Sequence, residues 1–535
     1  MAHRITFLPM NIVCESDGRE TVFQAAVKNG LNIRGDCGGA GVCGKCSLYI
    51  AGVGERLACR TPVDRDMTVR LFEAAGGGGP NGVTAAALPR GFAADRADRF
   101  RGRVGPNFGA ALDIGTTTVA GMLWNLDTAE PAGALALDNP QAVYGADIIS
   151  RISFTSENDG NLKTLQNAII SCVNEIITSL CGSAGIPREY IREIAAAGNT
   201  AMSHIFLGAD PSGLARAPFA PAYAGTARVR ASRLGINIDP AADAILLPNI
   251  AGHVGGDMTA VLLYTGLRRL KGVNMAVDIG TNGEVMLCGK GRALACSAAA
   301  GPAFEGASVK MGMRAREGAI SGVRFAGGGA DPEIQAGIRL DVIGAGIPTG
   351  VCGSGLIAAV AQMLSFGVID RSGMLLSREA YLAAGGGEAL AGRIRRGDGC
   401  AEFVLYRCAG AGQRDVVITQ RDIRQVQLAK GAIMAGINIL LRELSVTARD
   451  LDSVTLAGAF GSHIDKRAAV AVGLLPDIPL ERVISAGNAA GGGASMALLS
   501  GGALREAEEL AAGVEHIELS AHPGFQDEFI GCMGF

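Results

Sequence analysis

Two phrases of one design constrain this sequence more than any other feature. LDIGTTT covers residues 112–118, and VDIGTNGE covers residues 277–284. In each, an apolar run typical of a buried strand leads to an aspartate, and a glycine–threonine turn follows it. Such a turn can direct backbone N–H groups at phosphate oxygens, and the aspartate can hold Mg²⁺ through water and orient a nucleophilic water. One phrase alone is a common turn between strands, but two of them predict a duplicated phosphate site.

The sequence around both phrases alternates strand and helix patterns. A helical pattern covers residues 161–182, a strand enters a helix in REIAAAGNTAMSHIFLG, and residues 421–444 have the period of an amphipathic helix. We therefore predict two related α/β halves, residues 108–268 and residues 269–535.

The first 75 residues have a separate pattern. Residues 4–13 and the runs CSLYIAG and MTVRLFE predict strands, and ETVFQAAVKNG predicts a short helix that Gly30 ends. The stretch 76–107 is rich in Gly, Ala, Pro and charged residues and has little periodicity. We predict a small α/β domain over residues 1–75. A linker over residues 76–107 follows, flexible in its glycine part, with a random-coil span of about 30 Å.

Four cysteines lie close together in this N-terminal domain. Their spacing is Cys37-x5-Cys43-x2-Cys46-x12-Cys59, in a glycine-rich run. Three thiolates from one loop and a fourth from a neighbouring segment suit a [2Fe–2S] cluster, whose plant-type spacing is C-x4-C-x2-C with a later cysteine. The glycines let the loop bend tightly and direct N–H groups at sulfur, which tunes the reduction potential. We predict a [2Fe–2S] cluster on these four residues.

Zinc and free thiols stay open as alternatives to an iron–sulfur cluster. Zinc sites prefer two C-x2-C pairs, and one such pair is present here. Free structural thiols do not usually gather in this way. A disulfide framework belongs to small secreted chains, whereas this chain has 535 residues and 13 cysteines, an odd number. The remaining cysteines lack ligand spacing and are expected to be buried as small hydrophobic side chains.

Composition excludes several classes of function. The formal net charge is −3, so no field of one sign gathers nucleic acid or an anionic membrane. Gly, Pro or charge interrupts the apolar runs before they reach the length of a membrane span, and the N-terminus lacks a secretory signal pattern. We expect a soluble cytoplasmic protein with no nucleic-acid or membrane partner.

Two further glycine-rich phrases complete a nucleotide pattern. LAGAFGSHID covers residues 456–465, where Gly458 and Gly461 would let adenine and ribose lie against the backbone, and SAGNAAGGGA covers residues 485–494. The P-loop sequence G-x4-G-K-[ST] does not occur. With the two aspartate turns, these phrases resemble the phosphate-1, phosphate-2 and adenosine motifs of the actin, sugar-kinase and heat-shock ATPase superfamily. That resemblance implies two RNase-H-like α/β halves.

A [2Fe–2S] domain joined to an actin-like ATPase resembles the RACo-like reductive activators of corrinoid proteins. The likeness extends over nearly the whole chain and includes NPQAVYGADIISRI (139–152), LPNIAGHVGGD (247–257), GVCGSGLIAAV (350–360) and ITQRDIRQVQLAKGAI (418–433). It implies a β-grasp ferredoxin-like N-terminal domain and an ATP-hydrolysing oxidoreductase. Such an enzyme passes one low-potential electron to an inactive Co(II) corrinoid protein and restores Co(I) for methyl transfer.

The same resemblance assigns roles to residues. Cys37, Cys43, Cys46 and Cys59 would ligate the cluster, and Asp113 and Asp278 would act at the phosphates of ATP and at Mg²⁺. Glu284 would orient the attacking water or is an ordinary solvated side chain. The nucleotide contacts would come from Gly115, Thr116, Thr117, Gly280, Thr281, Asn282, Gly458 and Gly461. The implied partners are a corrinoid protein of a methyltransferase system, an unidentified reductant and a second copy of the chain in a homodimer.

Three different functions fit the same motifs. The chain could donate electrons to another low-potential enzyme, act as a small-molecule kinase with a ferredoxin appendage, or sense redox state while binding ATP without turnover. Formation of Co(I) that depends on ATP would separate corrinoid activation from all three.

Overall fold

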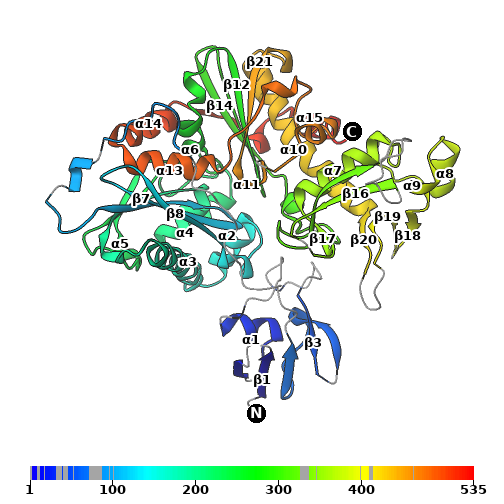
Figure 1. Cartoon of the computed structure of the whole chain (residues 1–535), viewed down its shortest axis with the longest axis horizontal. Helices are drawn as coiled ribbons and strands as arrows, with labels where there is room; N and C mark the ends of the chain where they lie inside the picture. Colours follow the sequence, from blue (N-terminus) through cyan, green and yellow to red (C-terminus); the bar gives the residue numbers. More distant parts are fainter. Residues whose placement is uncertain are drawn as a thin grey trace. The chain divides into compact units, whose positions relative to one another are not determined.

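Residues 1–264 and 490–512 form one unit of the structure, and residues 265–489 and 513–535 form the other. The computed structural model describes residues 3–8, 12–16, 18–29, 31, 39, 46–51, 53–70, 87–95, 97–100, 102–325, 337–344, 346–397, 399–408, 414–461 and 463–535 (Figure 1). Among these residues, no helix combines the length and the apolar character that a membrane crossing needs. The predicted boundaries at residues 75, 107 and 268 stay predictions.

A small five-stranded sheet forms the N-terminal part. Its strand order is β2-β1-β5-β3-β4, with β1 and β5 parallel and the other pairs antiparallel. Its elements are β1 (His3–Leu8), β2 (Ile12–Ser16), α1 (Val22–Lys28), β3 (Ser47–Ile50), β4 (Gly54–Leu57), η1 (Ala58–Arg60) and β5 (Met67–Arg70). The prediction of one strand over residues 4–13 is wrong, because β1 and β2 are separate strands that pair as an antiparallel hairpin.

The sequence explains how this part folds. Thr21 caps α1 in a reciprocal capping box with Gln24. Ile5 and Phe7 alternate inward from β1 and pack with Phe23 of α1 in one buried core. A small sheet with one helix across it is therefore held by a single apolar layer.

The first ATPase-like half is built on a six-stranded sheet. Its order is β10-β11-β9-β6-β7-β8, in which β6, β7 and β8 form an antiparallel meander and β9 runs parallel to β6. Its elements are η2 (Ala97–Phe100), β6 (Phe108–Ile114), β7 (Thr118–Asn125), β8 (Pro131–Asp138), η3 (Pro140–Val143), α2 (Ile148–Glu157), α3 (Asn161–Ala184), η4 (Arg188–Tyr190), β9 (Ile191–Gly198), α4 (Thr200–Leu207), η5 (Ser212–Ala215), β10 (Ala227–Arg230), α5 (Ala231–Leu234), β11 (Asp243–Leu246), α6 (Gly256–Thr265), α13 (Ala489–Leu499) and α14 (Gly501–Ala512).

Helices cover both faces of this sheet. A side chain at Gly121 of β7 would meet Ile176 of α3, which therefore packs tightly on one face. On the other side, Trp124 of β7 is 1% exposed and its indole N–H donates to Ser495 Oγ of α13 at 2.9 Å. The late helix α13 therefore completes the core of the first half.

The second half repeats the same central arrangement. Its sheet has the order β22-β21-β12-β13-β14-β23, with β12, β13 and β14 antiparallel and β21 parallel to β12. Its elements are η6 (Leu267–Arg269), β12 (Val273–Ile279), β13 (Gly283–Gly289), β14 (Arg292–Ala298), α10 (Gln420–Glu443), η9 (Ala448–Asp450), β21 (Leu451–Ala457), α11 (Gly458–Gly461), α12 (Lys466–Ala471), η10 (Leu480–Arg482), β22 (Val483–Ser485), β23 (Glu515–His516), η11 (Leu519–Ala521) and α15 (Phe525–Gly531).

An additional set of elements lies between β14 and α10 in the chain. It contains two three-stranded sheets, β16-β15-β17 and β18-β19-β20. The elements are η7 (Pro302–Glu305), β15 (Ala319–Phe325), β16 (Ile338–Val342), β17 (Gly350–Val351), α7 (Gly353–Ser365), α8 (Arg378–Ala383), α9 (Glu388–Ala391), β18 (Ile394–Arg396), β19 (Ala401–Tyr406) and β20 (Val416–Thr419). The insertion distinguishes the second half from the first.

Candidate functional site

The first aspartate turn lies at the end of the central strand of the first half. Asp113 is the second-last residue of β6, and the chain turns back into β7 at Thr118. The Gly115 N–H donates to Thr118 O at 3.0 Å and closes the turn. A side chain at Gly115 would lie 2.7 Å from that oxygen, so glycine is required for this close approach. The predicted residues Gly115, Thr116 and Thr117 therefore form one compact loop beside Asp113.

Three side chains from other elements hold this loop. Asn139 donates through Nδ2 to Gly115 O at 2.9 Å, and Arg151 of α2 donates through Nη2 to Thr116 O at 2.6 Å. Asn199, which caps α4, donates to Thr116 Oγ1 at 3.0 Å. Because the loop oxygens accept these bonds, its conformation is fixed before any ligand binds.

The second aspartate turn is one residue shorter. Asp278 of β12 lies opposite Glu284 of β13, and the Gly280 N–H donates to Asn282 O at 2.9 Å. Thr281 is 6% exposed, and its hydroxyl donates to Glu305 Oε1 at 2.6 Å. The predicted residues of the second loop thus lie together within their own half, with Glu305 as a neighbour.

Glu284 occupies a buried position in the second sheet. It is 9% exposed, and Ser297 Oγ of β14 donates to its Oε1 at 3.3 Å. Opposite residues of an antiparallel pair project from the same face, so Glu284 shares a face with Asp278. The alternative of an ordinary solvated side chain does not describe this position.

The predicted adenosine phrase meets the second loop directly. Gly458 follows β21 with φ +79°, and a side chain there would lie 2.4 Å from Asp278 Oδ1. Gly461 lies three residues later at the end of α11, packed on Leu456. Glycine is required at position 458 both by its backbone conformation and by the neighbouring carboxylate.

Two of the four predicted cluster ligands lie in the described part of the chain. Cys46, just before β3, and Cys59, in η1, have sulfur atoms 3.1 Å apart. The Cys59 N–H points at Cys46 Sγ with an N···S distance of 3.5 Å. Cys37 and Cys43 lie outside the described residues. Two thiols from separate elements therefore converge where the spacing predicts a metal centre.

The segment before β6 is anchored to the first half. Asp95 accepts hydrogen bonds at the start of α14, from Ser500 Oγ at 2.9 Å and from Gly501 N at 2.6 Å. Tyr264 Oη donates to Ala87 O at 2.8 Å. Contacts between the predicted linker and the ATPase half therefore begin no later than residue 87.

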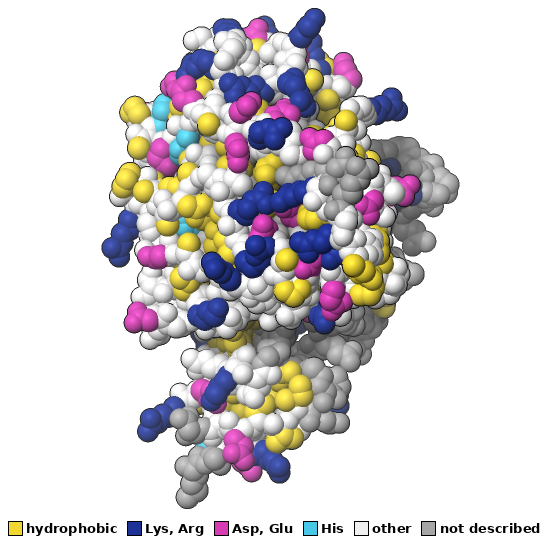
Figure 2. Space-filling model, turned by 90° about the vertical axis from the view of Figure 1, so that its left-hand side faces the viewer, with side chains coloured by type: hydrophobic (Ala, Val, Ile, Leu, Met, Phe, Trp, Pro, Cys, Tyr) yellow, Lys and Arg dark blue, Asp and Glu magenta, His cyan; other side chains and the backbone are white. Residues whose placement is uncertain are grey.

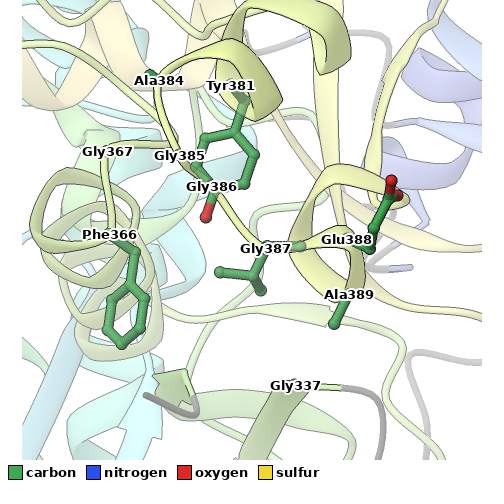
Figure 3. A pocket seen from close by; sticks show the side chains of 11 residues that line it. Gly337, Phe366, Gly367, Tyr381, Ala384, Gly385, Gly386, Gly387, Glu388 and Ala389 are labelled. Atoms are coloured by element: carbon green, nitrogen blue, oxygen red, sulfur yellow. The ribbon is translucent and has the colours of Figure 1, made fainter. Parts of the chain in front are cut away.

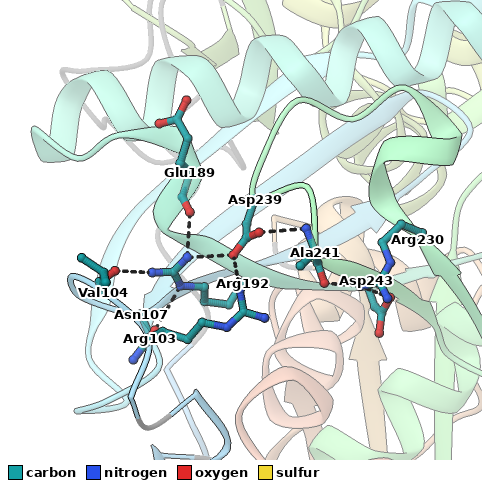
Figure 4. Close-up of polar contacts among 9 residues, drawn as sticks. All are labelled: Arg103, Val104, Asn107, Glu189, Arg192, Arg230, Asp239, Ala241 and Asp243. Carbon is teal, nitrogen blue, oxygen red and sulfur yellow. Dashed lines mark hydrogen bonds and ion pairs between the residues drawn. The ribbon is translucent and has the colours of Figure 1, made fainter.

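A buried ion pair fixes the last part of this segment (Figure 4). Arg192 of β9 contacts Asp239 at 2.7 Å, and both are buried, while the half-exposed Arg103 contacts the same carboxylate at 3.0 Å. Arg192 also donates to Asn107 Oδ1 at 3.1 Å and to Val104 O at 2.7 Å. These bonds set the direction in which the chain enters β6 and so help to position Asp113.

Opposite charges alternate on the face drawn in Figure 2, where Lys and Arg side chains are interspersed with Asp and Glu. In the first half, Arg230 and Asp243 form one partly exposed pair of opposite charges at 3.0 Å. Salt screens exposed charges over a Debye length of about 10 Å at 0.1 M ionic strength, so these surface charges act mainly on near neighbours.

The second half also contains a hollow of about 510 Å³ (Figure 3). Its lining is mostly apolar or glycine and includes Phe366, Tyr381, Leu390 and the glycines 385–387. None of the predicted nucleotide or cluster residues lines it. We therefore assign neither ligand to this hollow.

Sequence reasoning missed four of the residues that shape the loops. Asn139 and Arg151 lie in NPQAVYGADIISRI, which the family likeness marked without giving them a role, and Asn199 lies in REIAAAGNTAMSHIFLG, which predicted only a strand that enters a helix. Glu305 belongs to none of the motifs described above. Their contacts join residues far apart in the chain, and no spacing rule predicts such contacts.

The geometry first defines a class of protein. Each half places an aspartate at the end of a central strand, next to a glycine–threonine turn, and the second half adds a glycine-rich helix start at that aspartate. Residues 108–270 match the RACo middle region, and residues 272–535 match the C-terminal domain of RACo, the ASKHA domain. The body is therefore an ASKHA-type ATPase fold of two α/β halves.

Individual relatives narrow the class to a family. The chain is 35% identical over 427 residues to the corrinoid activation enzyme RamQ of Eubacterium limosum, which covers 79% of this chain and 70% of RamQ. It is 24% identical over 412 residues to the [Co(II) methylated amine-specific corrinoid protein] reductase of Methanosarcina barkeri, covering 71% and 68% of the two chains. A solved reductive activator for a corrinoid, iron–sulfur protein covers 100% of this chain and 98% of its own, at 29% identity and a TM-score of 0.71. The chain belongs to the RACo family of reductive activators of corrinoid proteins.

Proposed function

We propose that this protein uses ATP to drive one low-potential electron into an inactive Co(II) corrinoid protein, which restores the Co(I) state used in methyl transfer. The observation that carries the proposal is the likeness of 100% of the chain to a solved reductive activator, at a TM-score of 0.71. The two curated relatives, a corrinoid activation enzyme and a Co(II) corrinoid protein reductase, support the same activity.

ATP with Mg²⁺ is the proposed ligand of the two aspartate loops. The match to an ASKHA domain supports ATP binding. Asp113 with Gly115, Thr116 and Thr117 would serve phosphate oxygens from the first half, through a loop whose shape is already fixed.

The second half would supply the remaining contacts. Asp278 and Glu284 project from one face, and carboxylate oxygens are the ligands that Mg²⁺ prefers. Gly280, Thr281 and Asn282 would face the phosphates, and Gly458 and Gly461 the adenosine. The close approach of Gly458 to Asp278 supports a nucleotide that lies across both segments.

A [2Fe–2S] cluster in a β-grasp ferredoxin-like domain is the proposed electron carrier, held by Cys37, Cys43, Cys46 and Cys59. The sulfurs of Cys46 and Cys59, 3.1 Å apart, are too distant for a disulfide and close enough to serve one metal centre. The Cys59 N–H directed at Cys46 sulfur is the kind of contact that adjusts a cluster potential. When bound, such a cluster supplies single electrons at a reduction potential of about −400 mV.

ATP is needed in this proposal because the electron moves uphill. Each 100 mV against the gradient costs about 2.3 kcal/mol per electron. Nucleotide binding and hydrolysis would offset that cost by changing how the two halves hold the Co(II) protein, since a ligand shifts an equilibrium only through differential affinity. The proposed partners are a corrinoid protein of a methyltransferase system and a reductant that reloads the cluster. The family resemblance alone supports a homodimer.

An anaerobic spectroscopic assay tests the proposal. The reduced protein is mixed with a Co(II) corrinoid protein, and Co(I) is followed in the visible spectrum with Mg-ATP, with Mg-ADP and without nucleotide. Cys59→Ser is compared with Cys400→Ser, since Cys400 is a free cysteine outside the predicted ligand set. We expect Co(I) only with ATP, its loss in Cys59→Ser and its retention in Cys400→Ser. Absence of Co(I) from a protein with an intact cluster spectrum and intact nucleotide binding would move the electron acceptor to another low-potential enzyme.

A further inference from the structure

A short hydrogen bond in the second half joins the second aspartate turn, the predicted phosphate-2 loop (residues 278–282), to η7. Thr281 Oγ1 and Glu305 Oε1 are 2.6 Å apart, the short distance of a hydroxyl bonded to a carboxylate. Thr281 is 6% exposed, so water does not compete freely for its hydroxyl. A hydroxyl has one proton to donate, and here that proton is directed at Glu305. The contact therefore fixes the orientation of a side chain that is predicted to face phosphate.

The position of Glu305 is set by its own backbone. Gly301 and Gly306, with φ +74° and +76°, bound the short helix η7. A side chain at Gly306 would lie 2.6 Å from Met313 N, so this end of η7 is packed against the following segment. Glu305 thus approaches Thr281 from a rigid element rather than from a free loop.

The neighbouring residue contacts the adenosine side. Phe304 is 3% exposed, and its ring stacks on that of Phe460 in α11, with centroids 5.5 Å apart and an interplanar angle of 11°. A side chain at Gly353 would meet both Phe304 O and the Phe460 ring, so the start of α7 closes over this stack. Two consecutive residues of η7 therefore touch the two predicted nucleotide segments of this half.

We propose that Glu305 is a positioning residue of the ATPase site, which holds the Thr281 hydroxyl in place and, with Phe304, ties the phosphate-2 loop to the adenosine-side helix α11. The inference rests on the proposed ATP hydrolysis and adds a residue to it. It depends on the reach of the side chain and on its acceptor oxygen, not on its negative charge. Gln at position 305 keeps both the reach and an acceptor oxygen, whereas Asp keeps the charge but is one methylene too short.

The test compares Glu305→Gln with Glu305→Asp in the full chain. ATP hydrolysis is measured as kcat and KM, and binding of a fluorescent ATP analogue with Mg²⁺ is measured separately. We expect Glu305→Gln to retain most of kcat/KM and Glu305→Asp to lose about twofold to tenfold, the range for a hydrogen bond between uncharged groups, because the inference assigns no role to the negative charge. Glu317→Gln, at an exposed position of the same half, is the matched control and should match the wild type.

A double-mutant cycle with Thr281→Val completes the test. If Glu305 acts through Thr281, Glu305→Asp should add little to the loss caused by Thr281→Val. Equal activity of the Gln and Asp variants, a better Asp variant, or losses that multiply in the double variant would each overturn the inference. A wild-type protein that neither binds nor hydrolyses ATP would instead overturn the proposed function. The melting temperature of each variant identifies losses that come from unfolding.

Discussion

The two ATPase halves share a sheet design but support their aspartate loops differently. In both, an antiparallel hairpin carries the loop, and a parallel strand lies beside the aspartate-bearing strand. The first loop accepts hydrogen bonds from Asn139 and Arg151, whereas the second donates one from Thr281 to Glu305. The two loops therefore share one backbone arrangement, but different side chains from elsewhere in the chain support each of them.

The cross-strand neighbours of the two aspartates extend this contrast. Asp113 lies opposite Ala120, but Asp278 lies opposite Glu284. Two carboxylates on one face repel each other unless a cation lies between them. We therefore expect the second half to carry most of the dependence on Mg²⁺.

Replacing the aspartates should give the largest effects. Asp113→Asn and Asp278→Asn should each lower ATP hydrolysis by about 10²–10³-fold, the range for losing one electrostatic group at a reacting centre. Asp278→Asn should also raise the Mg²⁺ concentration needed for half-maximal activity more than Asp113→Asn does. Steady-state hydrolysis over a Mg²⁺ titration measures both quantities. Equal Mg²⁺ requirements in the two variants would remove the proposed difference between the halves.

Buried carboxylates offer a comparison of stability. In the first half, Asp239 pairs with the buried Arg192 and the half-exposed Arg103. In the second half, Glu402 is equally buried but pairs with Lys310 and Arg395, whose side chains are 42% and 47% exposed. Asp239→Asn leaves a buried guanidinium without its ion-pair partner and should cost about 3 kcal/mol. Glu402→Gln leaves two cations that can turn to water and should cost about 1 kcal/mol.

The cost of Asp239→Asn should depend on pH. Burial raises the pKa of Asp239, but the Ala241 N–H, the hydrogen bond from Arg192 and the charges of Arg103 and Arg192 outweigh it and leave the pKa below its ordinary value of 3.8. The contribution of this carboxylate to stability is therefore present above the ordinary pKa and is lost as the pH falls through the lowered one. Trp124, the single tryptophan, reports urea unfolding of the first half by fluorescence. A gap between wild type and variant that does not shrink as the pH is lowered below 3.8 would contradict this account.

Much of the fold follows from the sequence because it depends on local patterns. The aspartate loops, the helices α3 and α10 and the strand pairs around each loop lie where apolar period and glycine placement predict them. The hairpin of β1 and β2 was not predicted, because residues 4–13 are apolar enough to pass for one strand, although Pro9 and Asn11 between the two strands are residues typical of turns.

The supports of the site could not be predicted in the same way. Arg151 reaches Thr116, and Glu305 reaches Thr281, only after helices and strands have packed. An arginine in an amphipathic segment and a glutamate beside a glycine are usually surface residues, so neither signals a buried contact by type. Residue spacing locates a loop, whereas tertiary packing decides what holds it.

Two equivalent glycines lie beside the two aspartates, and they should differ in how well they tolerate an added side chain. Ala197 and Ala457 are the parallel-strand neighbours of Asp113 and Asp278, and Gly198 and Gly458 follow them. A side chain at Gly458 would meet the Asp278 carboxylate and would have to adopt φ +79°, whereas the atoms nearest to one at Gly198 are backbone and side-chain atoms of Ile114.

Alanine at the two glycines tests that difference. Left-handed backbone costs about 1–2 kcal/mol for a residue with a side chain, so Gly458→Ala should lower ATP hydrolysis by about tenfold or more. Gly198→Ala should act mainly through stability, seen as a lower melting temperature with a smaller change in KM for ATP. Greater loss of ATP binding in Gly198→Ala than in Gly458→Ala would show that the first half, not the second, sets the position of its aspartate by close packing.

The smallest change in stability is expected on replacing Arg103, the exposed partner of Asp239 in the first half. Arg103 contacts Asp239 at 3.0 Å, but its side chain is 44% exposed. Arg103→Gln should therefore cost less than about 1 kcal/mol, because an exposed cation gains little from pairing and is screened by salt. The difference from wild type, measured by Trp124 fluorescence in urea, should disappear near 1 M salt, where the screening length is about 3 Å. Arg192 contacts the same carboxylate from a buried position and is screened much less, so the cost of Asp239→Asn should persist at that salt concentration. If both costs vanish together, Arg192 and Asp239 are more hydrated than their burial indicates, and the first half would hold its carboxylate no more firmly than the second holds Glu402.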